Sequence, residues 1–116
     1  MTDALIAIFE QNTALRKDVD LFYLEIPLDK SGLWFMDRQT INAPTRYREY
    51  DIFCRGKTKN SAKQNVDYIQ SKIDDMPVCK LADGTKFRLR LLNTFDFVGK
   101  DTEGYYVFTS TVRLFR

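Results

Sequence analysis

Apolar residues recur along this chain at two different spacings, which predict alternating helical and extended segments. The first segment has the three-to-four-residue spacing of one helix face, set by Leu5, Ile8, Phe9 and Leu15. We expect Thr2 or Asp3 to cap this helix, because their side chains can accept hydrogen bonds from its first free N–H groups. The helix is predicted to end near Arg16 and Lys17, whose charges suit the negative end of a helix dipole.

Residues 20–28 change to a two-residue alternation, which predicts a half-buried strand. A hairpin turn at residues 29–32 then leads into a second strand, residues 33–39. In this second strand Leu33 and Phe35 point to one face, and Trp34 and Met36 point to the other. Leaving one such side chain in water costs about 1.5–3 kcal/mol. We therefore expect one face to cover the core and the other to meet a helix, a loop or another subunit. A helix of the same chain is the favoured cover.

Residues 46–55 predict a third strand, with Tyr50, Ile52 and Cys54 on its apolar face. A basic loop, residues 56–60, leads into a second helix. Ser61 and Gln64 have the spacing of a capping box. An apolar stripe at helical spacing follows, formed by Ala62, Val66, Ile69 and Ile73, with Met76 as a possible extension. Asp74, Asp75 and Pro77 are predicted to end the helix.

The remaining segments predict strands and turns. Residues 78–81 form a short strand, and Asp83-Gly84 is typical of a hairpin. The strand that starts at Phe87 is expected to run on toward Phe97, and a turn over 99–104 precedes a last strand. The order is helix, three strands, helix, three strands. It predicts one α+β domain over residues 1–116, with a mostly antiparallel sheet and both helices packed on one face.

Composition narrows the function classes. The 18 Lys and Arg against 16 Asp and Glu give a net charge of +2, too small to predict nucleic acid as the main partner. The chain has no histidine, the commonest general acid or base and the commonest metal ligand. We expect no catalytic, metal-binding or cofactor-binding residues, and hence no enzyme. Cys54 and Cys79 lack the spacing of a metal or redox motif and predict buried free thiols.

The chain start has no basic region before an apolar core, and no segment approaches the ~20 apolar residues of a membrane helix. We expect a protein with no membrane partner that is made and folded in a cytoplasm.

Several short motifs have a chemical and a purely structural interpretation. Gly56-Lys57-Thr58 is similar to the end of a phosphate loop, but Asp51 stands where the upstream glycine is required. We therefore interpret it as a turn before a helix. The pair Glu49 and Asp51 could do acid–base work, but charge pairing with the nearby Arg46, Arg48 and Arg55 is the favoured interpretation.

Two basic groups remain as candidate contact sites. The first, at the start of the second helix, consists of Arg55, Lys57, Lys59 and Lys63; the second consists of Arg88 and Arg90. Helix N-termini attract anions, and aromatic residues beside basic ones, as in Tyr47-Arg48 and Phe87-Arg88, can stack on bases. A small module that contacts nucleic acid or an acidic protein is therefore the alternative function. The balanced charge favours an ordinary solvated face over nucleic-acid binding.

The segment 50–60, YDIFCRGKTKN, with the helix after it, resembles the tail terminators of long-tailed phages with flexible tails, a family of minor capsid or tail-completion proteins. The resemblance covers the order of elements from end to end: an N-terminal helix, an early hairpin, a strand with a basic loop, an amphipathic helix and aromatic C-terminal strands. The matching pattern is one of residue types.

The resemblance implies a structural role without catalysis. Such proteins form a ring, typically of six copies, that caps the tail tube, stops its growth and presents a surface to the head connector. It implies a virion protein of the tail or neck, whose partners are other copies of itself, the tail tube protein and the connector. We place Trp34 and Met36 at a subunit or core boundary. Arg55, Lys57 and Lys59 are placed on a loop open to the tube or neck, and Arg88 and Arg90 form a second contact stripe.

Overall fold

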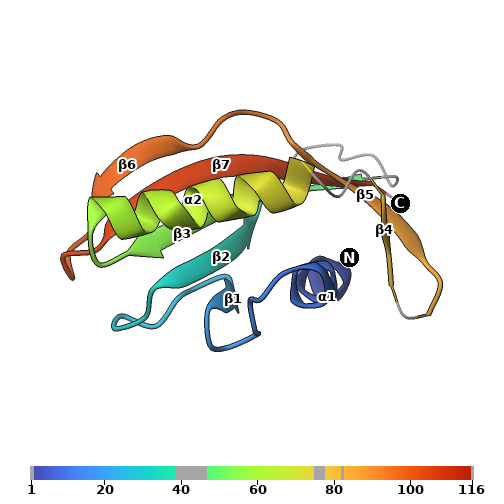
Figure 1. Cartoon of the computed structure of the whole chain (residues 1–116), viewed down its shortest axis with the longest axis horizontal. Coiled ribbons are helices and arrows are strands. Elements are labelled where there is room, and N and C mark those ends of the chain that lie inside the picture. The colour runs from blue at the N-terminus through green and yellow to red at the C-terminus, as the bar shows by residue number, and fades with distance from the viewer. Residues whose placement is uncertain (1, 39–46, 75–77, 82, 116) are drawn as a thin grey trace.

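The computed structural model describes residues 2–38, 47–74, 78–81 and 83–115, which form two helices and seven strands (Figure 1). The helices are α1 (Thr2–Asn12) and α2 (Lys59–Asp74). The strands are β1 (Leu21–Tyr23), β2 (Gly32–Asp37), β3 (Tyr47–Gly56), β4 (Cys79–Lys80), β5 (Lys86–Leu91), β6 (Asp96–Lys100) and β7 (Tyr106–Phe115).

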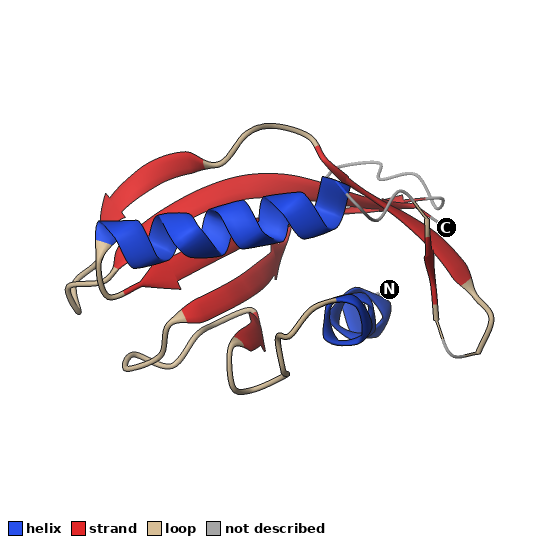
Figure 2. Ribbon diagram, viewed as in Figure 1, coloured by secondary structure: helices blue, strands red, loops and turns tan. Residues whose placement is uncertain are grey.

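The strands form one curved sheet in the order β1-β2-β3-β7-β5-β4, with β6 also paired to β7. The long strands β3 and β7 lie at its centre and are paired over their whole lengths. On its other side β7 pairs first with β6 and then with β5, so these two strands share one edge of β7. Figure 2 shows the helices together on one side of this sheet. The predicted α+β class, with a mostly antiparallel sheet, is confirmed.

The core lies between the sheet and the two helices. The inward face carries Leu33 and Phe35 of β2 and Tyr50, Ile52 and Cys54 of β3, all at most 2% exposed. The predicted stripe of α2 is buried against it at Ala62, Val66, Ile69 and Ile73. Leu5, Ile8 and Phe9 of α1 belong to the same core, and the rings of Phe9 and Phe35 are 5.2 Å apart. The side-chain spacing therefore identified the core correctly.

The predicted hairpin between the first two strands is wrong. β1 contains three residues and runs parallel to β2, with Leu21 opposite Leu33 and Tyr23 opposite Phe35. Leu24 has a φ of 69°, which ends the strand and turns the chain away. The segment 24–31 returns as a loop that brings the chain back to the start of β2. Alternation indicates an extended chain, but it does not fix the direction in which a strand pairs.

The end of α1 also differs from the prediction. The helix stops at Asn12, because the side chains of Asn12 and Thr13 donate hydrogen bonds to the carbonyls of Ile8 and Phe9. Arg16 lies beyond the helix, yet its guanidinium donates to the carbonyls of Glu10 and Thr13. The positive charge of Arg16 therefore lies at the C-terminal end of α1, as expected, although Arg16 itself is not part of the helix. At Thr2 and Asp3 the structure describes the backbone and not the side chains, so their capping role stays a prediction.

The start of α2 is capped three residues earlier than predicted. Thr58 precedes the helix, and its Oγ1 accepts a hydrogen bond from the Ser61 N–H at 3.0 Å, while Ser61 Oγ accepts one from the Thr58 N–H at 3.0 Å. This reciprocal pair makes Thr58 the cap and Ser61 its partner. A Cβ on Gly56 would lie 2.5 Å from the Ala62 nitrogen, so this glycine allows the end of β3 to pack against α2.

The C-terminal half contains four strands where three were predicted. The hairpin at Asp83-Gly84 is confirmed, with β4 and β5 antiparallel on either side of it. The long strand expected from Phe87 onward is two strands, because the Asn93 side chain bonds to Ser110 Oγ and to the Thr111 N–H and interrupts the pairing. The predictions for residues 39–46, and for Asp75, Met76 and Pro77, lie outside the described residues.

Candidate functional site

The face of the sheet opposite the helices carries the features most relevant to function, and we call it the open face. It is formed by the side chains that alternate with the core residues, among them Trp34 and Met36 of β2 and Phe53 of β3. The rings of Trp34 and Phe53 stack, with centroids 4.6 Å apart and an angle of 11° between their planes. Met36 is 40% exposed. The expectation that a helix covers this face is wrong, because α1 and α2 both pack on the other one.

An apolar hollow of about 350 Å³ lies on the open face beside this stack. Trp34, Phe53 and Val107 line its base, while Ile26 and Leu28 line it from the 24–31 loop. Val98 lines it from β6, where a register shift between Phe97 and Gly99 breaks the alternation. Leu28 and Val98 are 67% and 60% exposed. Exposed apolar side chains grouped around a hollow are typical of a contact surface.

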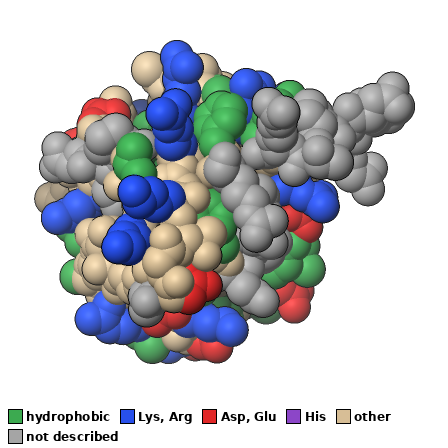
Figure 3. All heavy atoms as spheres, turned by 90° about the vertical axis from the view of Figure 1, so that its right-hand side faces the viewer, with side chains coloured by type: hydrophobic (Ala, Val, Ile, Leu, Met, Phe, Trp, Pro, Cys, Tyr) green, Lys and Arg blue, Asp and Glu red, His purple; other side chains and the backbone are tan. Residues whose placement is uncertain are grey.

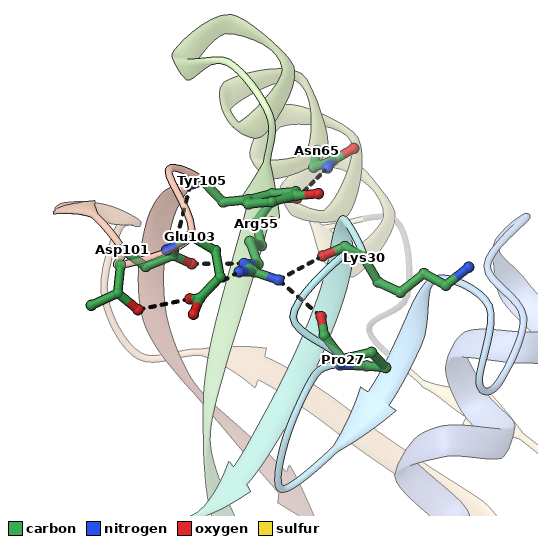
Figure 4. A network of polar contacts seen from close by, with 8 residues as sticks. Pro27, Lys30, Arg55, Asn65, Asp101, Glu103 and Tyr105 are labelled. Carbon is green, nitrogen blue, oxygen red and sulfur yellow. Dashed lines mark hydrogen bonds and ion pairs between the residues drawn. The ribbon is translucent and has the colours of Figure 1, made fainter.

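Arg55 holds the two loops that wall the hollow (Figure 4). Its Nη1 donates to the carbonyls of Pro27 at 3.0 Å and Lys30 at 2.9 Å, which fixes the 24–31 loop. Its Nε donates to Asp101 Oδ2 at 2.7 Å, and its Nη2 lies 3.7 Å from Glu103 Oε2. One buried guanidinium, 2% exposed, therefore joins two loops that are distant in sequence.

The turn after β6 is built around Asp101. Its Oδ1 accepts hydrogen bonds from the N–H groups of Glu103 and Tyr105, while Oδ2 accepts the bond from Arg55. The Tyr105 ring then lies under the guanidinium, 4.0 Å from Cζ. Burial raises the pKa of the Asp101 carboxyl. The hydrogen bonds from Arg55, Tyr105 and Glu103 and the charge of Arg55 outweigh that effect and hold the pKa below its ordinary value.

The placement of Arg55 on an accessible loop is therefore wrong. Arg55 is the penultimate residue of β3, and the two loops close over its side chain. Its acidic partners, Asp101 and Glu103, come 46 and 48 positions later in the sequence. A local sequence pattern therefore could not predict this ion pair. The rule that a buried arginine needs several acceptors identifies the network once the fold is known.

Lys57 and Lys59 are exposed, as predicted, at the start of α2. The Lys59 ammonium lies 4.5 Å from the centre of the Phe97 ring. Phe97 pairs with Phe108, whose side chain belongs to the core face, so this contact is on the helix side of the sheet. The structure thus separates Lys59 from the apolar hollow and from Trp34.

Arg88 and Arg90 lie at the other end of β7, along β5. The register aligns Tyr47, Phe115 and Arg88 in one row across the open face, and Glu49, Arg113 and Arg90 in the next. Arg113 pairs with Glu49 at 2.6 Å and lies 4.4 Å from the Tyr47 ring. Glu49 is charge-paired, but its partner among the described residues is Arg113 and not one of the predicted arginines: Arg55 pairs with Asp101, and Arg46 lies outside the described residues. Phe87, expected to be available for stacking, is buried.

A second open hollow, of about 960 Å³, runs along β5 beside the end of α2, and we call it the basic groove. Its charged lining consists of Asp74, Lys86, Arg88 and Arg90, and Ile73, Val78 and Leu91 supply apolar surface. Among the residues that the structure describes, none forms an ion pair with Lys86, Arg88 or Arg90. Figure 3 faces this end of the molecule and shows Lys and Arg side chains spread across it.

Other chemistry is not assembled in the described part of the chain. No group of three or more His, Cys, Asp or Glu side chains there is placed to hold a metal ion. Cys54 and Cys79 are buried, reduced thiols, as predicted, and burial raises the pKa of both. Neither of the two described helices is long and apolar enough to cross a membrane.

Comparisons with known proteins bear on the fold. No protein-family model and no curated protein matches the chain. One solved structure, of a protein that carries only a serial identifier, has a similar fold, with a TM-score of 0.50. The alignment covers 99% of this chain and 94% of the other chain, at 13% sequence identity. At that identity the likeness shows a shared fold alone.

Proposed function

We propose that this protein is a structural assembly protein that associates with copies of itself. The observation that carries the proposal is the apolar hollow on the open face, with Leu28 and Val98 exposed at its rim. Exposing such side chains in water costs about 1.5–3 kcal/mol each, and association regains that free energy. The hollow is also preformed, because Arg55 fixes its walls, so binding needs little ordering of loops.

Within this class we propose the role that the sequence pattern suggests. The protein forms a ring at the head-proximal end of a phage tail, where it ends the tail tube and meets the head connector. Its partners are then its own copies, typically six, the tail tube protein and the connector, and its place is the virion. The exposed Lys57 and Lys59, away from the hollow, leave a separate surface for the tube or connector.

Electron microscopy of the purified protein in negative stain tests this role. We expect closed rings of uniform diameter with a central opening. Single small particles at every protein concentration, or open filaments without closure, would contradict it.

A second candidate function rests on the two rows of the open face near β5. Tyr47 and Phe115 with Arg88, and Arg113 with Arg90, combine aromatic rings and guanidinium groups on neighbouring strands. This arrangement is suited to single-stranded nucleic acid or an acidic protein segment. Titration of a fluorescent single-stranded oligonucleotide tests it: binding that weakens steeply with salt supports this function, and no binding at low salt removes the nucleic-acid version.

A further inference from the structure

We infer that the copies associate head to tail, with the apolar hollow of one copy receiving the basic groove of the next. This inference rests on the proposed self-association and specifies its two surfaces. Both surfaces combine exposed apolar side chains with charge, and their charges are opposite in sign.

The hollow and the depression beside it are together lined by more acidic than basic residues. Asp101 and Glu103 line the hollow, 27% and 34% exposed, and the lining cation Arg55 is buried between them. The adjoining depression shares Ile26 and Leu28 with the hollow and adds Asp18 and Glu25, and none of the described residues that line it is basic. The basic residues Arg55 and Lys100 balance the two acidic residues of the hollow itself. The excess of two acidic residues over the whole surface therefore comes from Asp18 and Glu25 of the depression.

The basic groove has the opposite character. Lys86, Arg88 and Arg90 are exposed along β5, and Asp74 is the acidic residue of the lining among those that the structure describes. Val78, which also lines it, is 53% exposed and offers an apolar side chain to a partner. Surfaces of opposite charge steer association and disfavour contacts between like surfaces. The hollow is thus expected to reject a second hollow and to accept a groove.

The two surfaces cannot meet within one molecule. The hollow lies where β3 ends and β7 begins, and the groove lies where β7 ends, so they stand at opposite ends of the long axis, which extends 39 Å (Figure 1). When the hollow of one copy binds the groove of another, the resulting dimer still has one free groove and one free hollow. Such a heterologous contact forms a ring where the rotation between neighbouring copies closes, and an open filament where it does not.

Two variants, each blocked at one surface, test this inference by sedimentation velocity. Leu28→Lys with Val98→Lys puts positive charge at the rim of the hollow and leaves the groove intact. Arg88→Glu with Arg90→Glu reverses the groove and leaves the hollow intact. All four residues are exposed, so folding is expected to be unchanged, as far-UV circular dichroism checks. Lys63→Glu with Lys72→Glu on α2 is the control for a matched change of charge.

We expect the wild type and the control to form the same oligomer, and each blocked variant to be monomeric. An equimolar mixture of the two blocked variants should form a dimer and nothing larger, because each supplies the surface that the other lacks. An oligomeric wild type whose blocked variants assemble alone, or stay monomeric when mixed, would overturn the head-to-tail contact and leave self-association standing. A monomeric wild type would overturn both.

Discussion

Arg55 and Asp101 form an ion pair of 2.7 Å that joins the end of β3 to the turn after β6. The same guanidinium bonds the carbonyls of Pro27 and Lys30, so one side chain sets both walls of the apolar hollow. Because the guanidinium is buried while Asp101 is 27% exposed, loss of Arg55 leaves two carbonyls unpaired, and loss of Asp101 removes an acceptor from a buried charge.

Replacing Arg55 by Met should lower the free energy of unfolding by about 2–4 kcal/mol, since it leaves the carbonyls of Pro27 and Lys30 without their donor. Urea denaturation followed by circular dichroism measures the change. The control is Lys63→Met, which removes an exposed pair with Asp67 and should cost about 0.5 kcal/mol or less. Equal losses in the two variants would show that the Arg55 network does not stabilise the fold.

The Asp101 carboxyl should make the free energy of unfolding depend on pH in the acidic range. Its folded pKa lies below the ordinary value of 3.8, so its contribution is complete above that value and is lost as the pH falls through the lower folded pKa. Asp101→Asn lacks this contribution at every pH. The difference in unfolding free energy between the wild type and Asp101→Asn should be larger at about pH 6 than at about pH 2. A difference that stays constant between these two pH values would show that the pKa of Asp101 is not lowered by folding.

Val66→Asp should unfold the domain, because Val66 is 1% exposed on the buried stripe of α2 and an unpaired carboxylate cannot be accommodated there. Gln64→Asp, two residues earlier on the exposed side of the same helix, is the matched control. Far-UV circular dichroism distinguishes the two. A folded Val66→Asp protein would mean that the packed face of α2 is assigned incorrectly.

Lys57→Glu with Lys59→Glu should leave folding and self-association intact and weaken binding to the tail tube or connector. Both side chains are exposed and lie apart from the hollow. Co-sedimentation with assembled tail tubes measures the effect, with Lys17→Glu and Lys72→Glu, outside this basic group, as the charge-matched control. Normal co-sedimentation, or an unfolded double variant, would remove these lysines from the contact.

The two cysteines should be unreactive in the native protein. Cys54 and Cys79 are 0% and 3% exposed, and burial raises the pKa of each thiol, so little thiolate is available. A thiol reagent such as a disulfide dye should react only after denaturation. Fast reaction of either cysteine in the folded protein would show that its surroundings open readily.

The sequence allowed the core to be predicted far better than the candidate site. The spacing of Val66, Ile69 and Ile73, and the alternation of Tyr50 and Ile52, report directly which side chains face inward. These residues are buried as expected. Periodicity is a local property of the chain, and burial of an apolar face follows from it.

The site depends on contacts between distant segments, which periodicity does not encode. Arg55 was expected to be exposed because its neighbours Lys57 and Lys59 are polar, whereas two loops bury it. Those loops depend on the parallel pairing of β1 and β2, which the positive φ of Leu24 permits. Trp34 lies on the open face and stacks on Phe53, and its place at a subunit or core boundary stays a prediction.

The most direct test of the central claim is the mass of the purified wild-type protein in solution, by sedimentation velocity over a wide range of concentration. Self-association through the open face predicts one discrete oligomer, an integer multiple of the 13.6 kDa chain, whose size does not grow further with concentration. A monomer at every concentration would contradict the claim that this protein assembles with its own copies.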